Sequence, residues 1–258
     1  MKKLLFISIA LISAFTFAQE ESEKDNELHE APYDFLDSFD SSRRDKETVF
    51  TNTKLLLAFG FNQALGDGNG IGEDYRFWGS GMFDVGLEFS TRLNKKDDLF
   101  RLTYGLNLRT QTLRLNDDRI FETQNSITNL VNAPFDLDRS RFTQFSFVAP
   151  VHIEFGKREL KEYEDGIKRY GGDDPFVAGI GGYIGYVTMT SQEIKYDREG
   201  RDVTSTLTND FEVNAFQYGL SAHAGWNNAQ FFITYGLNNI LDSSPLEQKH
   251  VSFGIRLR

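Results

Sequence analysis

Cysteine is absent from this sequence of 258 residues. The protein therefore forms no disulfides and has no thiolate metal ligands, and it lacks the cysteine that carries a lipoprotein anchor. Basic residues are the minority among the charged ones, because 28 Lys and Arg stand against 38 Asp and Glu, which gives a formal net charge of −10. This balance argues against nucleic acid as a partner, since a nucleic-acid surface needs an excess of positive charge.

Long apolar runs are also missing after the N-terminus, so no later segment offers the roughly 20 apolar residues that a membrane-spanning helix needs. Residues 1–18 begin with Lys2 and Lys3 and continue with an apolar run from Leu4 to Ala14. This run is too short for a spanning anchor, and the pattern is typical of a secretory signal. We expect residues 1–18 to be a signal peptide that is cleaved after Ala18.

Residues 19–52 have no hydrophobic period and are rich in Asp and Glu. This composition predicts a flexible, acidic periplasmic segment that leads into a folded domain, residues 53–258. A few apolar residues interrupt the segment: Tyr33, Phe35, Leu36 and Phe39. Two interpretations stay open for them, a short docking motif or plug, and a solvated tail with scattered aromatic residues.

Phenylalanine and glycine are abundant, with 24 and 22 copies. From residue 53 on, large apolar residues alternate with polar or small ones, as they do in strands with one apolar face. Eight segments have this pattern: 54–62, 83–92, 100–111, 144–155, 176–188, 216–226, 229–238 and 250–258. Glycine recurs on the polar parity of every segment except 144–155, which is typical of a narrow interior that must be filled without crowding.

The clearest pair of segments, 216–226 and 229–238, predicts a hairpin. Asn227-Asn228 between them tolerates the left-handed conformation of a type I′ turn. The expected register sets Gly219 opposite Gly236, so one face of the hairpin is small and polar while the other is large and apolar.

Charged residues share the polar parity of the segments 83–92 and 100–111. Their expected pairing sets Asp84 opposite Arg109 and brings Glu88 near further Arg residues. Such a face cannot touch hydrocarbon but can line a barrel interior, and no helix pattern is present that would cover the apolar face. The sequence therefore predicts an all-β fold, an eight-stranded antiparallel up-and-down transmembrane β-barrel in a bacterial outer membrane.

Connections alternate in length, which predicts the orientation of the barrel. The short connections, 94–98 and 227–228, are typical of periplasmic turns, and the brief 242–247 lies on the outer side. The long polar connections are expected as outer loops: 63–80, 116–140 and 191–212. Residues 156–174 lie on the periplasmic side by count but are long, which predicts a short helix or a loop that contacts a periplasmic or envelope partner. Aromatic residues that we expect to be exposed for partner contacts are Phe121, Phe135, Tyr163, Tyr170 and Tyr196.

Four stretches, 147–155, 178–186, 216–222 and 233–240, resemble the outer-membrane β-barrel proteins common in Bacteroidetes, the group that includes the PorT-like proteins. The resemblance rests on strand patterns such as Ala178-Gly179-Ile180-Gly181-Gly182, which specify architecture rather than activity. It implies an outer-membrane barrel of a Gram-negative bacterium. Through its PorT-like members it also implies a role in the secretion of proteins across the outer membrane.

Two glycine-rich stretches are similar to ligand-binding loops. Residues 67–72, followed by Glu73-Asp74, offer oxygens as a calcium loop does, but Ile71 and Trp78 stand where an EF-hand has ligands. Residues 179–185 look like a nucleotide-binding run, but the third glycine falls one place late and the stretch alternates like a strand. We therefore expect neither a metal nor a cofactor, with calcium at 67–74 as the open alternative.

Two inward pairs, His152 with Glu154 and His223 with Ser221, raise the possibility of an acyl hydrolase, which needs Ser, His and an acid in hydrogen-bond reach. Inward residues of an eight-stranded barrel face a packed lumen, which favours structural histidines instead. The acidic loop residues Asp117, Asp118, Asp136 and Asp138 have no loop histidine nearby to complete a general-base pair. The sequence thus predicts no catalytic residue. It predicts a non-enzymatic scaffold or interaction module, with transport, as a small porin or a secretion component, as the alternative.

Overall fold

The computed structural model describes residues 50–66, 73–94, 97–162, 168–171, 176–226, 228–242 and 244–258. The predicted signal peptide, residues 1–18, lies outside the described residues, and so does nearly all of the acidic segment 19–52. The calcium-like stretch 67–72, Asn227 of the predicted turn and Tyr163 also lie outside them. Within the described residues, no helix is long and apolar enough to cross a membrane.

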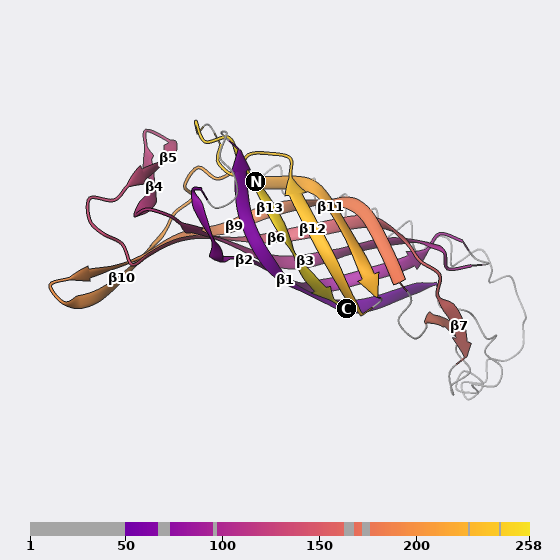
Figure 1. The fold of residues 1–258 in the computed structure, drawn as a ribbon. Coiled ribbons are helices and arrows are strands. Elements are labelled where there is room, and N and C mark those ends of the chain that lie inside the picture. Colours follow the sequence, from indigo (N-terminus) through magenta and orange to yellow (C-terminus); the bar gives the residue numbers. More distant parts are fainter. Residues whose placement is uncertain are drawn as a thin grey trace, which may run out of the picture. The chain divides into compact units, whose positions relative to one another are not determined.

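Eight antiparallel strands close into a barrel (Figure 1), which confirms the predicted all-β fold and the predicted eight-stranded antiparallel architecture. They are β1 (Thr51–Gly66), β2 (Tyr75–Arg92), β3 (Phe100–Leu115), β6 (Arg139–Phe155), β9 (Phe176–Arg198), β11 (Phe216–Trp226), β12 (Ala229–Gly236) and β13 (Gln248–Leu257). Around the barrel β9 is followed by β11, β12, β13, β1, β2, β3 and β6, and β6 pairs with β9 again. Strands that are neighbours in sequence are neighbours in space, and the first strand pairs with the last.

The predicted registers are confirmed in both hairpins for which they were derived. Gly219 pairs with Gly236 between β11 and β12. Asp84 pairs with Arg109 between β2 and β3. The strands alternate between exposed and buried residues, most regularly along β12, because successive side chains point to opposite faces of a sheet. The outside of the barrel is therefore an apolar wall, whereas Asp, Glu, Arg, His, Asn and Gln fill the inside.

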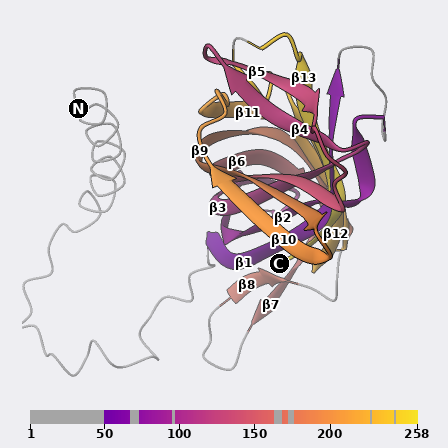
Figure 2. The same cartoon turned by 90° about the vertical axis from the view of Figure 1, so that its left-hand side faces the viewer.

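Three further hairpins extend the barrel at its two ends. At the end that we call the cap end, β4 (Arg119–Gln124) pairs with β5 (Ile127–Asn132), and β10 (Arg201–Thr208) pairs with the projecting part of β9. At the opposite end, the turn end, β7 (Glu159–Glu162) pairs with β8 (Lys168–Gly171). Figure 1 shows β10, β4 and β5 at one end of the barrel and β7 at the other, and Figure 2 looks onto the cap end.

Two expectations about connections are therefore wrong. The long stretches 63–80, 116–140 and 191–212 were expected as loops, but much of each lies in strands that continue beyond the barrel wall or form hairpins. The short helix considered for 156–174 is replaced, in its described part, by the β7–β8 hairpin. In each case the backbone polar groups of the segment are satisfied by antiparallel pairing. The segments are polar and lack the apolar alternation by which a strand is predicted from sequence.

Pro150 interrupts a ladder, as its missing N–H predicts. Between β3 and β6 the pairing of Tyr104 with Val151 is followed by that of Asn107 with Val148, which passes over Pro150. The β-bulge between β6 and β9 lies elsewhere, where Phe145 pairs with Met189 and Ser146 with Val187, so the extra residue is Thr188 of β9.

Candidate functional site

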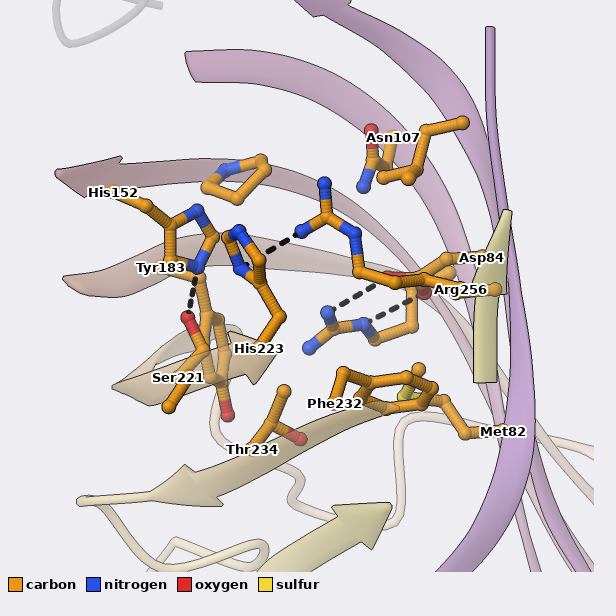
Figure 3. Close-up of a pocket in the computed structure, with 15 residues that line it drawn as sticks. Met82, Asp84, Asn107, His152, Tyr183, Ser221, His223, Phe232, Thr234 and Arg256 are labelled. Atoms are coloured by element: carbon orange, nitrogen blue, oxygen red, sulfur yellow. Dashed lines mark hydrogen bonds and ion pairs between the residues drawn. The ribbon is translucent and has the colours of Figure 1, made fainter. Parts of the chain in front are cut away.

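The lumen holds a cavity of about 40 Å³, which is the candidate site. It lies in the middle of the barrel, and inward residues of β1, β2, β3, β6, β9, β11, β12 and β13 line it (Figure 3). An apolar cluster of Ala58, Met82 and Phe232 forms one part of the lining, while ionisable and hydroxyl side chains form the rest. A volume of this size admits about three water molecules and no larger ligand.

Two glycines of β9 leave space inside the barrel in which side chains of the neighbouring strands meet. Gly181 pairs with His152 on one side and with Ser221 on the other. Because Gly181 has no side chain, the two neighbours reach across it, and His152 Nε2 lies 2.6 Å from Ser221 Oγ. Figure 3 shows these two side chains pointing toward each other.

Gly179 acts in the same way one step further along β9. It pairs with both Glu154 and His223, and His223 Nε2 lies 3.3 Å from Glu154 Oε2. The His223 ring occupies the space that a Cβ at Gly179 would fill. The sequence had suggested His152 with Glu154 and His223 with Ser221, and the hydrogen bonds join the opposite partners. The alternation of residues in the sequence predicts correctly that all four side chains point inward. It does not show that β9 lies between β6 and β11, and the partners depend on that strand order.

This geometry supplies a Ser–His hydrogen bond without the rest of a hydrolytic triad. The carboxylate of Glu154 bonds His223, not the histidine that bonds Ser221. Attack on an acyl group would further need space for that group beside the serine, and the cavity has none. The arrangement ties β6 to β11 across β9.

Arg109 and Asp84 form a second fixed contact beside the cavity. Arg109 Nε and Nη2 donate to Asp84 Oδ1 and Oδ2, each at 2.8 Å, in the bidentate geometry that strengthens such pairs. The guanidinium carbon also lies 4.7 Å from the centre of the Tyr183 ring. That ring fits because Gly219, on the neighbouring strand, leaves its space open.

A network of charged side chains, the ionic plug, fills the lumen at the turn end. Its members are Glu88, Asp98, Arg101, Glu154, Arg158, Arg256 and Arg258. Glu154 is its centre, because Arg101 Nη2, Arg258 Nη1 and Arg158 Nη2 lie 2.8, 2.6 and 3.2 Å from its carboxylate oxygens. Arg256 and Arg258 pair with Glu88. Four guanidinium groups thus share three carboxylates. Glu88, Arg101, Glu154 and Arg256 lie on β2, β3, β6 and β13, Asp98 and Arg158 lie in connections, and Arg258 follows β13.

Two members of the ionic plug lie in connections outside the strands. Burial raises the pKa of Asp98, although the nearby Arg101 and Arg158 act to lower it. Burial also lowers the pKa of Arg158, with a further contribution from Arg101, to about 10. Both directions have one cause, since these groups are held away from water in a crowded charge cluster.

An apolar cluster, the cap, fills the opposite end. Its buried members are Ala64, Tyr75, Leu113, Leu115, Phe121, Phe142, Phe211, Ile240 and Leu241. Phe121 was expected to be exposed, but it is 3% exposed and its ring centre lies 4.6 Å from that of Phe142. The cause is Gln192 of β9, whose amide accepts from Phe121 N at 2.7 Å and donates to Phe121 O at 3.1 Å. The Gln192 amide thus forms the two backbone hydrogen bonds that a neighbouring strand would form with Phe121, and it holds β4 over the barrel mouth.

The other predicted contact residues are distributed over the two ends. Phe135 and Tyr196 pack together at the cap end with ring centres 4.7 Å apart, and Phe135 is exposed. Tyr170 of β8 lies at the turn end, 4.7 Å from the guanidinium of Arg92. The acidic loop residues act locally: Asp117 pairs with Arg119 at 3.3 Å, and Asp118 Oδ1 accepts from Leu137 N at 2.9 Å. Among the described residues, no group of three His, Cys, Asp or Glu side chains is arranged to hold a metal ion.

Comparisons with known proteins add no assignment to this geometry. No protein-family model matches the sequence, and no curated protein matches it. The lumen itself is therefore the basis for a functional conclusion: a closed barrel with a cavity for a few waters, filled by the cap at one end and by the ionic plug at the other.

Proposed function

We propose that this protein is an integral outer-membrane β-barrel of a Gram-negative bacterium that acts as a non-enzymatic scaffold or interaction module. An apolar wall on the outside of a closed barrel supports insertion into lipid, because closure satisfies the backbone groups of every strand. In this proposal residues 1–18 are the cleaved signal, the turn end faces the periplasm and the cap end faces outward.

The filled lumen carries the proposal. A pore needs a continuous path for water, and the cap, the central hydrogen bonds and the ionic plug occupy that path from one end to the other. Catalysis by the serine and histidines of the lumen would need room for a substrate beside them, and the cavity of about 40 Å³ leaves none. The surfaces that project beyond the wall and remain for a protein partner are the hairpins at the two ends.

The location is tested by cell fractionation and by electrophoresis. The full chain is expected in the outer-membrane fraction, and its mobility in detergent gels should change on boiling, since a closed barrel resists unfolding by detergent. Recovery in the soluble periplasm, or a mobility that boiling leaves unchanged, would contradict the proposal.

A role in a protein-secretion assembly is the second candidate. The β7–β8 hairpin favours it, because Leu160 is exposed there on a segment that closure of the barrel does not require. In this role residues 156–174 would contact a periplasmic or envelope protein. A pull-down after mild crosslinking distinguishes a dedicated assembly partner from a scaffold that contacts only lipid.

A further inference from the structure

Three arginines lie side by side on the outward face of the barrel near the cap end, and we call them the arginine row: Arg76, Arg114 and Arg141. Arg114 pairs in register with Arg76 of β2 and with Arg141 of β6. The neighbours of opposite parity, such as Leu115 and Phe142, are buried in the cap, so the row points away from the lumen.

Like charges at directly paired positions destabilise a sheet, because the Cβ atoms are only about 5 Å apart. A carboxylate is nearby, since Glu193 of β9 pairs in register with Arg141. Glu193, however, bonds Arg139 at 2.8 Å. In the part of the chain that the structure describes, Arg114 and Arg141 form no ion pair, and Arg141 Nε has no hydrogen-bond acceptor. The row is therefore short of negative charge.

The height of the row on the barrel wall corresponds to a lipid headgroup layer. A hydrocarbon band about 25 Å thick corresponds to about ten residues of a strand that is tilted by about 40°. Counted along β3 from the exposed Phe100, this band ends near Thr110. Arg114 then lies about 10 Å beyond the edge of this band, so its flexible side chain extends into the headgroup layer.

Aromatic residues mark the same boundary beside the row. Phe61, Phe77, Trp78 and Phe253 form a cluster on the outward face, and its ring centres are 4.2 to 6.0 Å apart. Phe77 and Trp78 follow Arg76 directly, and Trp78 is 74% exposed. Aromatic side chains at this height are typical of a membrane interface.

We propose that the arginine row binds the phosphate of a phosphorylated lipid headgroup in the outer leaflet. Guanidinium groups bind phosphate oxygens in pairs of charge-assisted hydrogen bonds, and one phosphate between two paired strands would offset the repulsion within the row. A lipid fits this site better than free phosphate, because the apolar wall below the row and the aromatic cluster beside it receive its acyl chains. The inference rests on the proposed outer-membrane location.

The test compares two double variants of the full chain. In Arg114→Gln/Arg141→Gln, two charges of the row are removed. The control, Arg198→Gln/Arg201→Gln, removes another register-paired and exposed arginine pair, at the tip of the β9–β10 hairpin. Diphosphoryl lipid A, its dephosphorylated form and inorganic phosphate are each titrated into the purified proteins in neutral detergent, and the shift of the unfolding temperature gives the affinity.

The expected result is selective, phosphate-dependent binding. Wild type and the control should bind diphosphoryl lipid A equally, and the row variant should bind it about tenfold more weakly, the loss expected for a charge-assisted contact. Dephosphorylated lipid and inorganic phosphate should bind wild type much more weakly. Equal binding by the two double variants, or equal binding of the dephosphorylated lipid, would overturn the proposal. If inorganic phosphate bound as tightly as the lipid, the arginine row would be a site for soluble anions, and the proposal that it binds a lipid would be overturned.

Two further measurements separate binding from folding. Without lipid, the row variant should unfold at the temperature of wild type or above it, because repulsion within the row is removed; a lower temperature would indicate a structural role and count against the proposal. If the Gln variant does not fold, Arg114→Lys/Arg141→Lys replaces it in the test. This variant keeps the charge but lacks the two-pronged guanidinium group, so it should lose part of the affinity for diphosphoryl lipid A. If the protein fractionates with outer membranes but shows no preference for phosphorylated lipid, the proposed lipid site at the arginine row is contradicted. The proposed outer-membrane location is then unaffected.

Discussion

Glycine positions on one strand determine which polar side chains meet inside this barrel. Gly179 and Gly181 of β9 leave room for side chains of β6 and β11 to bond across them. His152, Ser221, Glu154 and His223 thereby find partners in a lumen too narrow for bulk water, where an unpaired group would be costly.

A single methyl group at such a position should therefore be destabilising. Gly179→Ala places a Cβ in the space of the His223 ring and displaces it from Glu154, at an expected cost of about 1 to 3 kcal/mol, as for other overpacked sites. The control is Gly81→Ala, where the new Cβ meets its nearest atom at 3.4 Å. Urea unfolding in detergent measures both variants, and equal midpoints would show that the ring can move without loss.

Arg109 offers a sharper case, because it is buried and bonded to Asp84 through two hydrogen bonds. Arg109→Leu leaves Asp84 charged and unpaired in the lumen, which should cost about 3 to 5 kcal/mol. Arg198→Leu, at an exposed hairpin position, should change the urea midpoint little. If the two variants unfolded at the same urea concentration, the inward position of Arg109 would be wrong.

Among the elements, the strands of the barrel wall could be predicted and the hairpins beyond them could not. In the wall one face is apolar and points outward while the other lines a polar lumen, so the residues alternate along each strand, as Phe231, Ile233 and Tyr235 do with their buried neighbours. The end hairpins lack that constraint. β10 is exposed along most of its length, and its two-residue turn at Glu199-Gly200, with positive φ angles of 56° and 76°, is a weak sequence signal.

The candidate site was predicted only in part for a related reason. The alternation of residues identified the inward histidines and acids, because the direction of a side chain depends only on its position within its own strand. Partner choice depends on three strands together and on strand order, as the exchange of partners between His152 and His223 shows. The burial of Phe121 depends on a single amide, that of Gln192, which bonds a residue of β4 that is 71 positions away in the sequence, and no local pattern signals such a contact.

The β7–β8 hairpin is the element whose removal should separate folding from recognition. Arg158 belongs to the ionic plug, so the deletion begins after it, with residues 159–171 replaced by a short Gly-Ser turn. The variant should keep its boiling-dependent mobility but lose a periplasmic partner that wild type captures after mild crosslinking. A matched deletion at the tip of the β9–β10 hairpin, residues 196–203, should keep that partner. Capture that survives the first deletion would place the contact elsewhere.

The molecule as a whole combines an apolar outer wall with an interior that is filled from the cap to the ionic plug. In planar bilayers the purified protein should therefore show no stable, large, ion-selective channel. Removal of the β4–β5 hairpin, residues 119–132, should leave it non-conducting, because the ionic plug still occupies the other end. A reproducible open channel in wild type would favour the porin alternative.

The chain has two tryptophans, and the barrel places both on its outer wall at opposite ends. Trp78 lies in β2 near the cap end and is 74% exposed, whereas Trp226 ends β11 at the turn end and is 57% exposed. Tryptophan fluorescence therefore originates from the two rims of the barrel and not from its interior. In a bilayer with brominated lipid in one leaflet, one indole would be quenched while the other kept emitting, so the unlabelled protein reports its own orientation.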